Sequence, residues 1–500
     1  MVRITDSKTL YKKYVAKLQK VADVRYAAAV LQWDQETYLP SKGSESRARQ
    51  LATLTEIGHQ LFVERSFGKL LNDLGLSEGL SEKERKNVEL TLEEVEKQKK
   101  FSSAFVRKMS EAVSKSFYAW IEARKQNDFS IFEPALDALL KLKREEAKIL
   151  GYTDHPYDAL LNEFEKGSSV AMLDPVFEKV LTPLGELLNE MTGKLQFGRD
   201  FLHQHFPKDQ QWEWSMFLIK ELGFDLEAGR QDISEHPFTT NFSSRDVRLT
   251  TRIDENDFAN MTWSCIHEAG HGLYEQGLPN EDYGLPSGEF ASLSIHESQS
   301  RLWENCVGRS IPFWSHYLPA LKRFFPKQLE KISVEQFVGA VNKVEPSLIR
   351  TEADELTYHF HIYIRYSLEK RLMEGSLSTK EIPFAWNELY SKYLNVQVPD
   401  AKKGCLQDVH WCHGSFGYFP TYSLGSFYAA QFWMQAKKEI IDLEDKISEG
   451  DTGVLLSWLR EKIHRHGKMY TSEELCKLVT GASLDSNMFI KYLRNKLLNQ

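Results

Sequence analysis

The sequence has few cysteines and no long apolar run. Only five Cys occur among 500 residues, at irregular spacing, and Cys405 and Cys412 are too far apart to form a zinc knuckle. No stretch approaches the length of about 18 apolar residues that a membrane helix requires, and the first ten residues lack the apolar core of a signal peptide. We therefore expect free thiols in a reducing compartment, a cytoplasmic location and no membrane partner.

The sequence also lacks a basic stripe, a flexible linker and an internal repeat. The net charge is -8, and no run of Lys and Arg is long enough to follow a nucleic-acid backbone. No Gly/Ser-rich or Pro-rich segment divides the chain, and no fixed period recurs. These absences argue against a nucleic-acid partner and predict a single unit over residues 1–500.

Helical patterns fill most of the chain. Segments rich in Leu, Ala, Lys and Glu predict helices at 8–36 (one helix or two), 44–61, 81–99 and, later, a long helix at about 347–375. Residues 236–255 differ, because Thr, Val, Ile and Phe flank a polar turn there and predict a β-hairpin. We expect a mainly α fold with this small β element, whose edge could hold an extended peptide.

One motif stands out immediately after that hairpin, His267-Glu268-Ala269-Gly270-His271, the pattern H-E-x-x-H. On a helix its two imidazoles lie one turn apart on one face, so both can bind one divalent metal. Glu268 lies close enough to accept a proton from water at that metal. The pattern also arises by chance, but Ile266, Ala269 and Leu273 give this segment an apolar face of its own, which favours a hydrolase site.

A catalytic zinc needs a third protein ligand. A Gly- and Pro-rich loop at 277–288 precedes a second helical pattern from about Ser292, and an antiparallel return would bring Glu297 over the metal. Alternatively, Ser294 and Glu297 fit a capping box, in which Glu297 would only satisfy backbone donors. We favour Glu297 as the ligand and keep Glu289 and Glu304 as alternatives.

Residues 402–425 form a loop rich in glycine and aromatic residues, a length and composition that indicate function in a helical protein. His410 and Trp411 stand in a G-x-x-Q-D-x-H-W string, and Tyr418 and Tyr422 follow it. His410, Tyr418 and Tyr422 are candidate donors to the oxyanion of a transition state, although Tyr in such a loop also serves as core packing.

Several motifs in order resemble the carboxypeptidase Taq family of thermostable metallocarboxypeptidases. They are 236–238 (His-Pro-Phe), 246–250 (Asp-Val-Arg-Leu-Thr), 267–271, 296–299 (His-Glu-Ser-Gln), 349–354 (Ile-Arg-Thr-Glu-Ala-Asp) and 404–411. The resemblance implies a two-lobed helical protein with a deep groove, an active-site Zn²⁺ or Co²⁺, removal of C-terminal residues from peptides, and a homodimer. We place the N-terminal lobe at roughly 1–230 and the metal-site lobe at roughly 231–500.

An exopeptidase of this kind must hold the free carboxylate of its substrate, and a guanidinium does so with two hydrogen bonds. Arg350 is the first candidate and Arg248 the second; each could instead form a structural salt bridge. His236 is expected near the groove, as a substrate contact or an anchor of the hairpin, and His296 could orient a metal ligand.

Three functions remain open at this stage. The first is a metallocarboxypeptidase that acts on peptides with a free C-terminus. The second is an endopeptidase or aminopeptidase on the same site, of which the aminopeptidase is disfavoured because no G-x-M-E-N-like string is present. The third is a non-catalytic peptide-binding protein, against which Glu268 argues, since a structural metal site needs no base.

Overall fold

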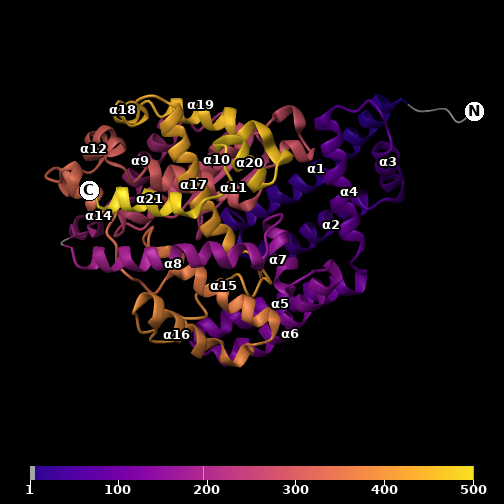
Figure 1. Ribbon diagram of the computed structural model, residues 1–500, viewed down its shortest axis with the longest axis horizontal. Helices are drawn as coiled ribbons and strands as arrows, with labels where there is room; N and C mark the ends of the chain where they lie inside the picture. The colour runs from indigo at the N-terminus through magenta and orange to yellow at the C-terminus, as the bar shows by residue number, and fades with distance from the viewer. Residues whose placement is uncertain (1–5, 195, 499–500) are drawn as a thin grey trace, which may run out of the picture.

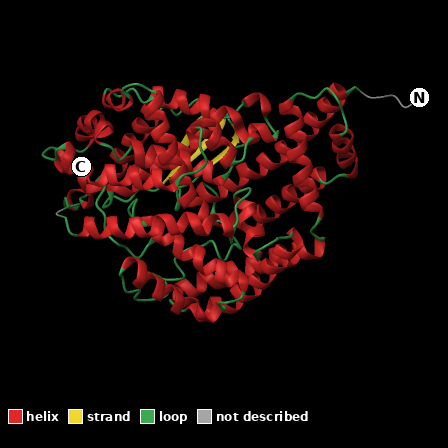
Figure 2. Ribbon diagram, viewed as in Figure 1, coloured by secondary structure: helices red, strands yellow, loops and turns green. Residues whose placement is uncertain are grey.

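Helices make up most of the computed structural model, which describes residues 6–194 and 196–498 (Figures 1 and 2). The first nine are α1 (Ser7–Thr37), α2 (Ser44–Phe62), α3 (Arg65–Gly75), α4 (Glu82–Lys99), α5 (Ser103–Gln126), α6 (Phe129–Leu150), α7 (Pro156–Phe164), α8 (Val170–Thr192) and α9 (Lys208–Glu221). The mainly α class is confirmed, and the pattern at 8–36 forms one helix. None of the helices in the described ranges is long and apolar enough to cross a membrane.

A second series of helices follows the strands. These are α10 (Phe258–Gly277), α11 (Leu293–Arg301), α12 (Ile311–Phe324), α13 (Pro326–Leu329), α14 (Val334–Val341), α15 (Tyr358–Glu374), α16 (Ile382–Leu394), α17 (Pro420–Glu439), α18 (Leu443–Ser448), α19 (Gly453–Lys462), α20 (Ser472–Thr480) and α21 (Ser486–Leu498). Local signals set many of the ends. Ser81 and Glu84 form a capping box at the start of α4, and Asn127 ends α5 in the left-handed conformation.

The small sheet lies among the helices and is drawn in yellow in Figure 2. Strands β2 (Thr239–Ser243) and β3 (Asp246–Thr251) are antiparallel, which confirms the predicted hairpin. A third strand, β1 (Gly229–Ile233), pairs in parallel with β3 and was not predicted. The strand order is β1-β3-β2, so β2 is an edge strand. Gly272 of α10 allows this helix to pack closely on the sheet, because a Cβ there would lie 2.7 Å from Leu249.

The prediction of a long helix at 347–375 was wrong at its start. Helix α15 begins only at Tyr358, and residues 350–352 form a short 3-10 turn that ends before Ala353. Asp354 explains the late start, because its carboxylate accepts hydrogen bonds from the backbone N–H groups of Leu356 and Thr357. Arg350 therefore lies on a turn next to the loop at 402–425, and not on a helix.

The apolar core consists of one large cluster and one small cluster. The large cluster runs from Ala123 to Leu497, whereas the small one joins residues of α1 to α4 with Leu285. In Figure 1, α1 to α4 gather at one end of the molecule, near the N-terminus. The single domain at 1–500 and its division into lobes at about residue 230 stay predictions.

Candidate metal centre

Helices α10 and α11 bring the predicted metal ligands together. Gly270 allows this approach, because a Cβ on it would lie 2.7 Å from Cα of Ser300. The two helices run antiparallel: His267 reaches Glu304 beyond the end of α11, while the later residue His271 faces the earlier residue Glu297. Gly425 of α17 also packs directly on the Glu297 side chain.

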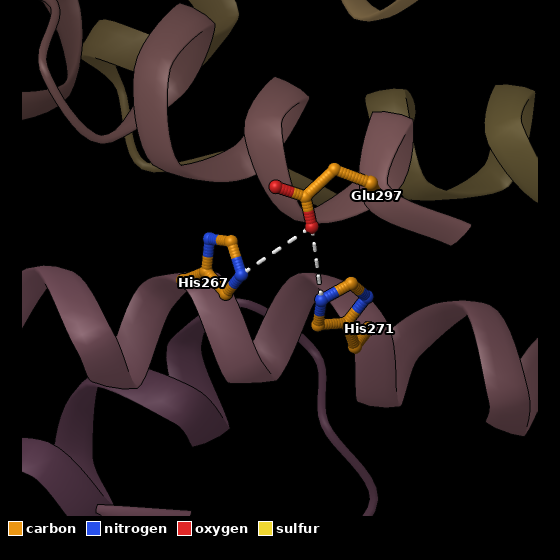
Figure 3. Close-up of side chains that lie close together, drawn as sticks. All are labelled: His267, His271 and Glu297. Carbon is orange, nitrogen blue, oxygen red and sulfur yellow. Dashed lines mark ion pairs between the residues drawn. The ribbon is translucent and has the colours of Figure 1, made fainter. Parts of the chain in front are cut away.

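The three predicted ligands point to one spot (Figure 3). Nε2 of His267 lies 3.6 Å from Oε2 of Glu297, and Nε2 of His271 lies 3.5 Å from the same oxygen. Of the groups in the described chain, His267, His271 and Glu297 form the set able to hold a metal ion. Ligand atoms about 2.1 Å from a tetrahedral ion are roughly 3.4 Å apart, so these donors fit a divalent metal such as zinc.

Charged side chains behind the ligands hold them in place. Glu304 accepts a hydrogen bond from Nδ1 of His267 at 2.9 Å, which leaves Nε2 to face Glu297. Arg301 donates to Oε1 of Glu297 at 2.7 Å and to Glu304 at 3.1 Å, and Arg309 also donates to Glu304. Glu304 reaches this position from a π-helical turn at Leu302–Val307 that continues α11.

The surroundings set the charge of the ligands. Burial alone would raise the pKa of Glu297, but Arg301 and the two imidazoles outweigh it, and the pKa lies well below its usual range. Burial and the neighbouring His296 lower the pKa of His271 to about 3. At neutral pH Glu297 is therefore ionised and His271 is neutral, which are the forms that bind metal. At His267, burial is outweighed by Glu297 and Glu304, which raise the pKa of this imidazole.

Glu268 is buried beside the ligands and is held by the sheet. The Thr239 hydroxyl, at the start of β2, lies 2.6 Å from Oε2 of Glu268 and 3.0 Å from its carbonyl oxygen. Burial raises the pKa of Glu268, which makes the carboxylate a stronger base than an exposed one. Sequence reasoning missed Thr239, and its position directly after the 236–238 motif was the available signal.

His296 contacts a ligand by stacking. Its ring lies 4.4 Å from the ring of His271, centroid to centroid, with an interplanar angle of 24°. Its Nε2 is 2.8 Å from Oε1 of Glu275, whose other oxygen accepts a hydrogen bond from Asn241 of β2. A chain of contacts thus joins the edge strand to a metal ligand.

The loop at 402–425 places its predicted donors together. Nε2 of His410 lies 3.1 Å from the Tyr422 hydroxyl, and the rings of Tyr418 and Tyr422 are 5.2 Å apart. Burial raises the pKa of Tyr418 to about 12 and that of Tyr422 further, so both keep their protons at neutral pH. Burial and Arg350 lower the pKa of His410 to about 3. The cluster therefore offers neutral hydrogen-bond donors.

Arg350 lies next to this cluster, 5.1 Å from the centre of the Tyr422 ring. Its guanidinium binds Asp408 at 2.9 Å and the Tyr358 hydroxyl at 3.1 Å, so it does not pair with Glu352. Arg365 is fully buried and binds the other oxygen of Asp408 at 2.6 Å. Two guanidinium groups thus share one carboxylate, which leaves an excess positive charge beside Tyr422.

Arg248 and His236 lie at the sheet. Arg248 forms an ion pair with Asp246, and its guanidinium carbon stacks 4.3 Å from the centre of the Trp33 ring of α1. His236 is exposed and lines a cleft between α1 and β2. Neither residue is within hydrogen-bonding distance of a metal ligand in the described chain.

Helix α11 and its surroundings show where the alternatives to Glu297 lie. Ser292 is its N-cap, and the Ser292 hydroxyl accepts from the N–H of Ile295, so the capping box proposed for Ser294 and Glu297 does not form. Glu289 instead faces Lys468, and Glu304 lies behind His267. Sequence reasoning found Glu304 as an alternative ligand but missed its role as the partner of His267.

The helical fold and the H-E-x-x-H site with its third carboxylate define a metal-dependent peptidase. The family model described as Carboxypeptidase Taq (M32) metallopeptidase matches residues 13–497, and the chain belongs to this family. Carboxypeptidase 1 of Bacillus subtilis is 37% identical over 493 residues, 98% of either chain. The chain is a metallocarboxypeptidase, a hydrolase that acts on peptides.

Solved structures agree with this assignment. The structure of CHT superposes with a TM-score of 0.97 at 55% identity, covering 98% of this chain and 100% of that one. The M32 carboxypeptidase from Deinococcus radiodurans R1 superposes with a TM-score of 0.96 at 37% identity, covering 98% and 99%. The family implies a divalent metal, and the donor set of His267, His271 and Glu297 fits one.

Proposed function

We propose that this chain removes C-terminal residues from peptides at a site where His267, His271 and Glu297 hold Zn²⁺, or alternatively Co²⁺. One observation carries the proposal: three potential ligand atoms, of His267, His271 and Glu297, converge next to the buried carboxylate of Glu268, which is not needed as a ligand. A divalent ion bound there lowers the pKa of water and polarises the carbonyl of the scissile bond.

Glu268 acts as the general base in this proposal. It takes a proton from the attacking water and passes it to the amine that leaves. Its buried position raises its affinity for that proton, and the hydrogen bond from Thr239 fixes its direction. His410, Tyr418 and Tyr422 are proposed to stabilise the oxyanion, because neutral donors in a buried site need no reorganisation.

Arg350 is the proposed ligand of the substrate's terminal carboxylate. Arg350 and Arg365 share the single carboxylate of Asp408, so one of their two positive charges is not neutralised. A substrate carboxylate would neutralise it. Arg248 remains the second candidate, and its own carboxylate partner argues against it. His236 is proposed to contact the substrate on the other side, where it lines the cleft next to Thr239.

Replacing Glu268 by Gln tests the mechanism. The variant is expected to keep its metal, measured by elemental analysis, and to lose at least about 100-fold in kcat, the lower end for a positioned acid–base group. Chelation of the native protein should also remove the activity. Full activity of Glu268→Gln would refute the assignment of the base.

The exopeptidase claim needs a separate test. One peptide is offered with a free and with an amidated C-terminus, and only the free form should be cleaved, because the amide offers Arg350 no charged partner. Equal cleavage of both would favour the endopeptidase alternative. No cleavage of either by the metal-loaded protein would favour a peptide-binding protein.

The cytoplasmic location and the homodimer are also proposals. All five cysteines are free and buried, which is consistent with a reducing compartment. The homodimer follows from the family resemblance alone.

A further inference from the structure

A cleft of about 390 Å³ runs between α1 and the edge strand β2 and has no place yet in the reaction. Its walls are Ala29, Gln32, Trp33 and Glu36 of α1, and residues 236–240 before and within β2. This volume lies within the range in which proteins bind small ligands. The cleft is therefore large enough to hold several atoms of a peptide.

The cleft is continuous with the active site through Thr239. The hydroxyl of this residue binds the proposed base Glu268, while the residue also lines the cleft. Thr240 lines it too, and successive side chains of a strand point to opposite faces. The cleft therefore follows the edge of β2, the position from which main-chain groups bind an extended peptide.

The other wall sets the length of the cleft. Ala29, Gln32, Trp33 and Glu36 recur at the spacing of one helix face and span roughly 10 Å at 1.5 Å per residue. An extended peptide rises about 3.4 Å per residue, so this wall matches about three residues. The Trp33 ring is held in place at the cleft, because Arg248 stacks on it and is itself paired with Asp246.

The cleft has one acidic side chain among its lining residues. Apart from the imidazole of His236, Glu36 is the one ionisable side chain among the lining residues. One oxygen of Glu36 accepts a hydrogen bond from Gln32 at 3.1 Å, and no cation is within ion-pair distance of it in the described chain. The carboxylate is exposed and available to a ligand.

We propose that this cleft binds the two or three substrate residues that precede the scissile bond, and that Glu36 favours a cationic group among them. The cation is either a Lys or Arg side chain or the free amino group of a short peptide. This proposal rests on the proposed function, since it takes Thr239 and Glu268 to mark the reacting end. It predicts sequence preference upstream of the residue that is released.

Glu36→Gln tests the charge. Blocked hexapeptides that share their last two residues carry one Lys, or Gln in its place, at each upstream position in turn. Native protein should favour the best Lys peptide by about two- to fivefold in kcat/KM at low salt, the size of an exposed ion pair, and high salt should reduce this preference. In Glu36→Gln the preference should disappear.

Two further comparisons show which group supplies the cation and whether the loss of preference is specific to Glu36. A Lys-free tripeptide, with and without an N-terminal acetyl group, reports on the amino group. The control Glu89→Gln removes an exposed carboxylate from α4 and should leave every ratio unchanged. If native protein prefers neither Lys nor the free amino group, the role of Glu36 is overturned. A preference that is equal in native protein and in Glu36→Gln overturns it as well.

Ala29→Phe tests the cleft itself. The larger side chain should fill the cleft and reduce kcat/KM more for hexapeptides than for a blocked dipeptide, which places only one residue in the cleft. Ala27→Phe, at an exposed position outside the cleft, is the control. Unchanged hexapeptide cleavage by Ala29→Phe overturns the subsite. Failure of the proposed function is distinguishable, because it would abolish dipeptide cleavage in the native protein as well.

Discussion

Replacing Glu304 by Gln should weaken metal binding without removing a metal ligand. Glu304 accepts a hydrogen bond from Nδ1 of His267 at 2.9 Å and thereby fixes the ring that presents Nε2 to the site. Loss of such a partner typically costs 10- to 100-fold in metal affinity, or about 1.4 to 2.7 kcal/mol. Gln keeps the shape and one acceptor oxygen, so the effect should lie near the lower limit. Competition with a chelator of known affinity measures it.

The assay also separates this effect from unfolding. Arg301 and Arg309 lose a charged partner in the variant, so thermal denaturation of the metal-free protein must be compared with that of the native chain. Glu289→Gln is the control, because Glu289 is a carboxylate near the same helices that faces Lys468. Unchanged metal affinity in Glu304→Gln would refute the reasoning that Glu304 positions His267.

Two further predictions concern packing and titration. Gly425→Ala places a Cβ 2.6 Å from the Glu297 side chain, so it should lower the free energy of unfolding by about 1–3 kcal/mol and weaken metal binding. Gly185→Ala is the control, because its Cβ would meet open space, and it should be neutral or stabilising. Denaturant titrations measure both variants. The titration prediction concerns Glu369, because burial raises its pKa to about 7, above the value in the unfolded chain. The stability that Glu369 contributes is therefore fully present below about pH 4.5 and is lost as the pH rises to about 7. Relative to Glu369→Gln, the native chain should lose about 3 kcal/mol of unfolding free energy over that interval. Parallel curves for native and variant protein would contradict this.

The structure differs most from the elements predicted from the sequence where the backbone is irregular. The helix expected at 347–375 starts only at Tyr358, since Asp354 binds backbone groups that a helix would use. Arg350 consequently meets Asp408, a partner far away in sequence. Strand β1 was missed because its five residues, Gly-Arg-Gln-Asp-Ile, carry no clear alternation and depend on pairing with β3.

The sequence by itself predicted the mainly helical class and the β-hairpin, which are confirmed, and the candidate metal ligands His267, His271 and Glu297, which stay a proposal. The helices, the hairpin and the His267–His271 pair depend on short-range periodicity, since an i, i+4 pair lies on one helix face wherever that helix packs. Glu297 additionally required the second helix to return antiparallel across a short loop. The tertiary structure alone decided which groups hold them, such as Glu304 behind His267 and Thr239 beside Glu268. These contacts join residues on different elements. They depend on the close packing of the folded chain, which no local sequence pattern encodes.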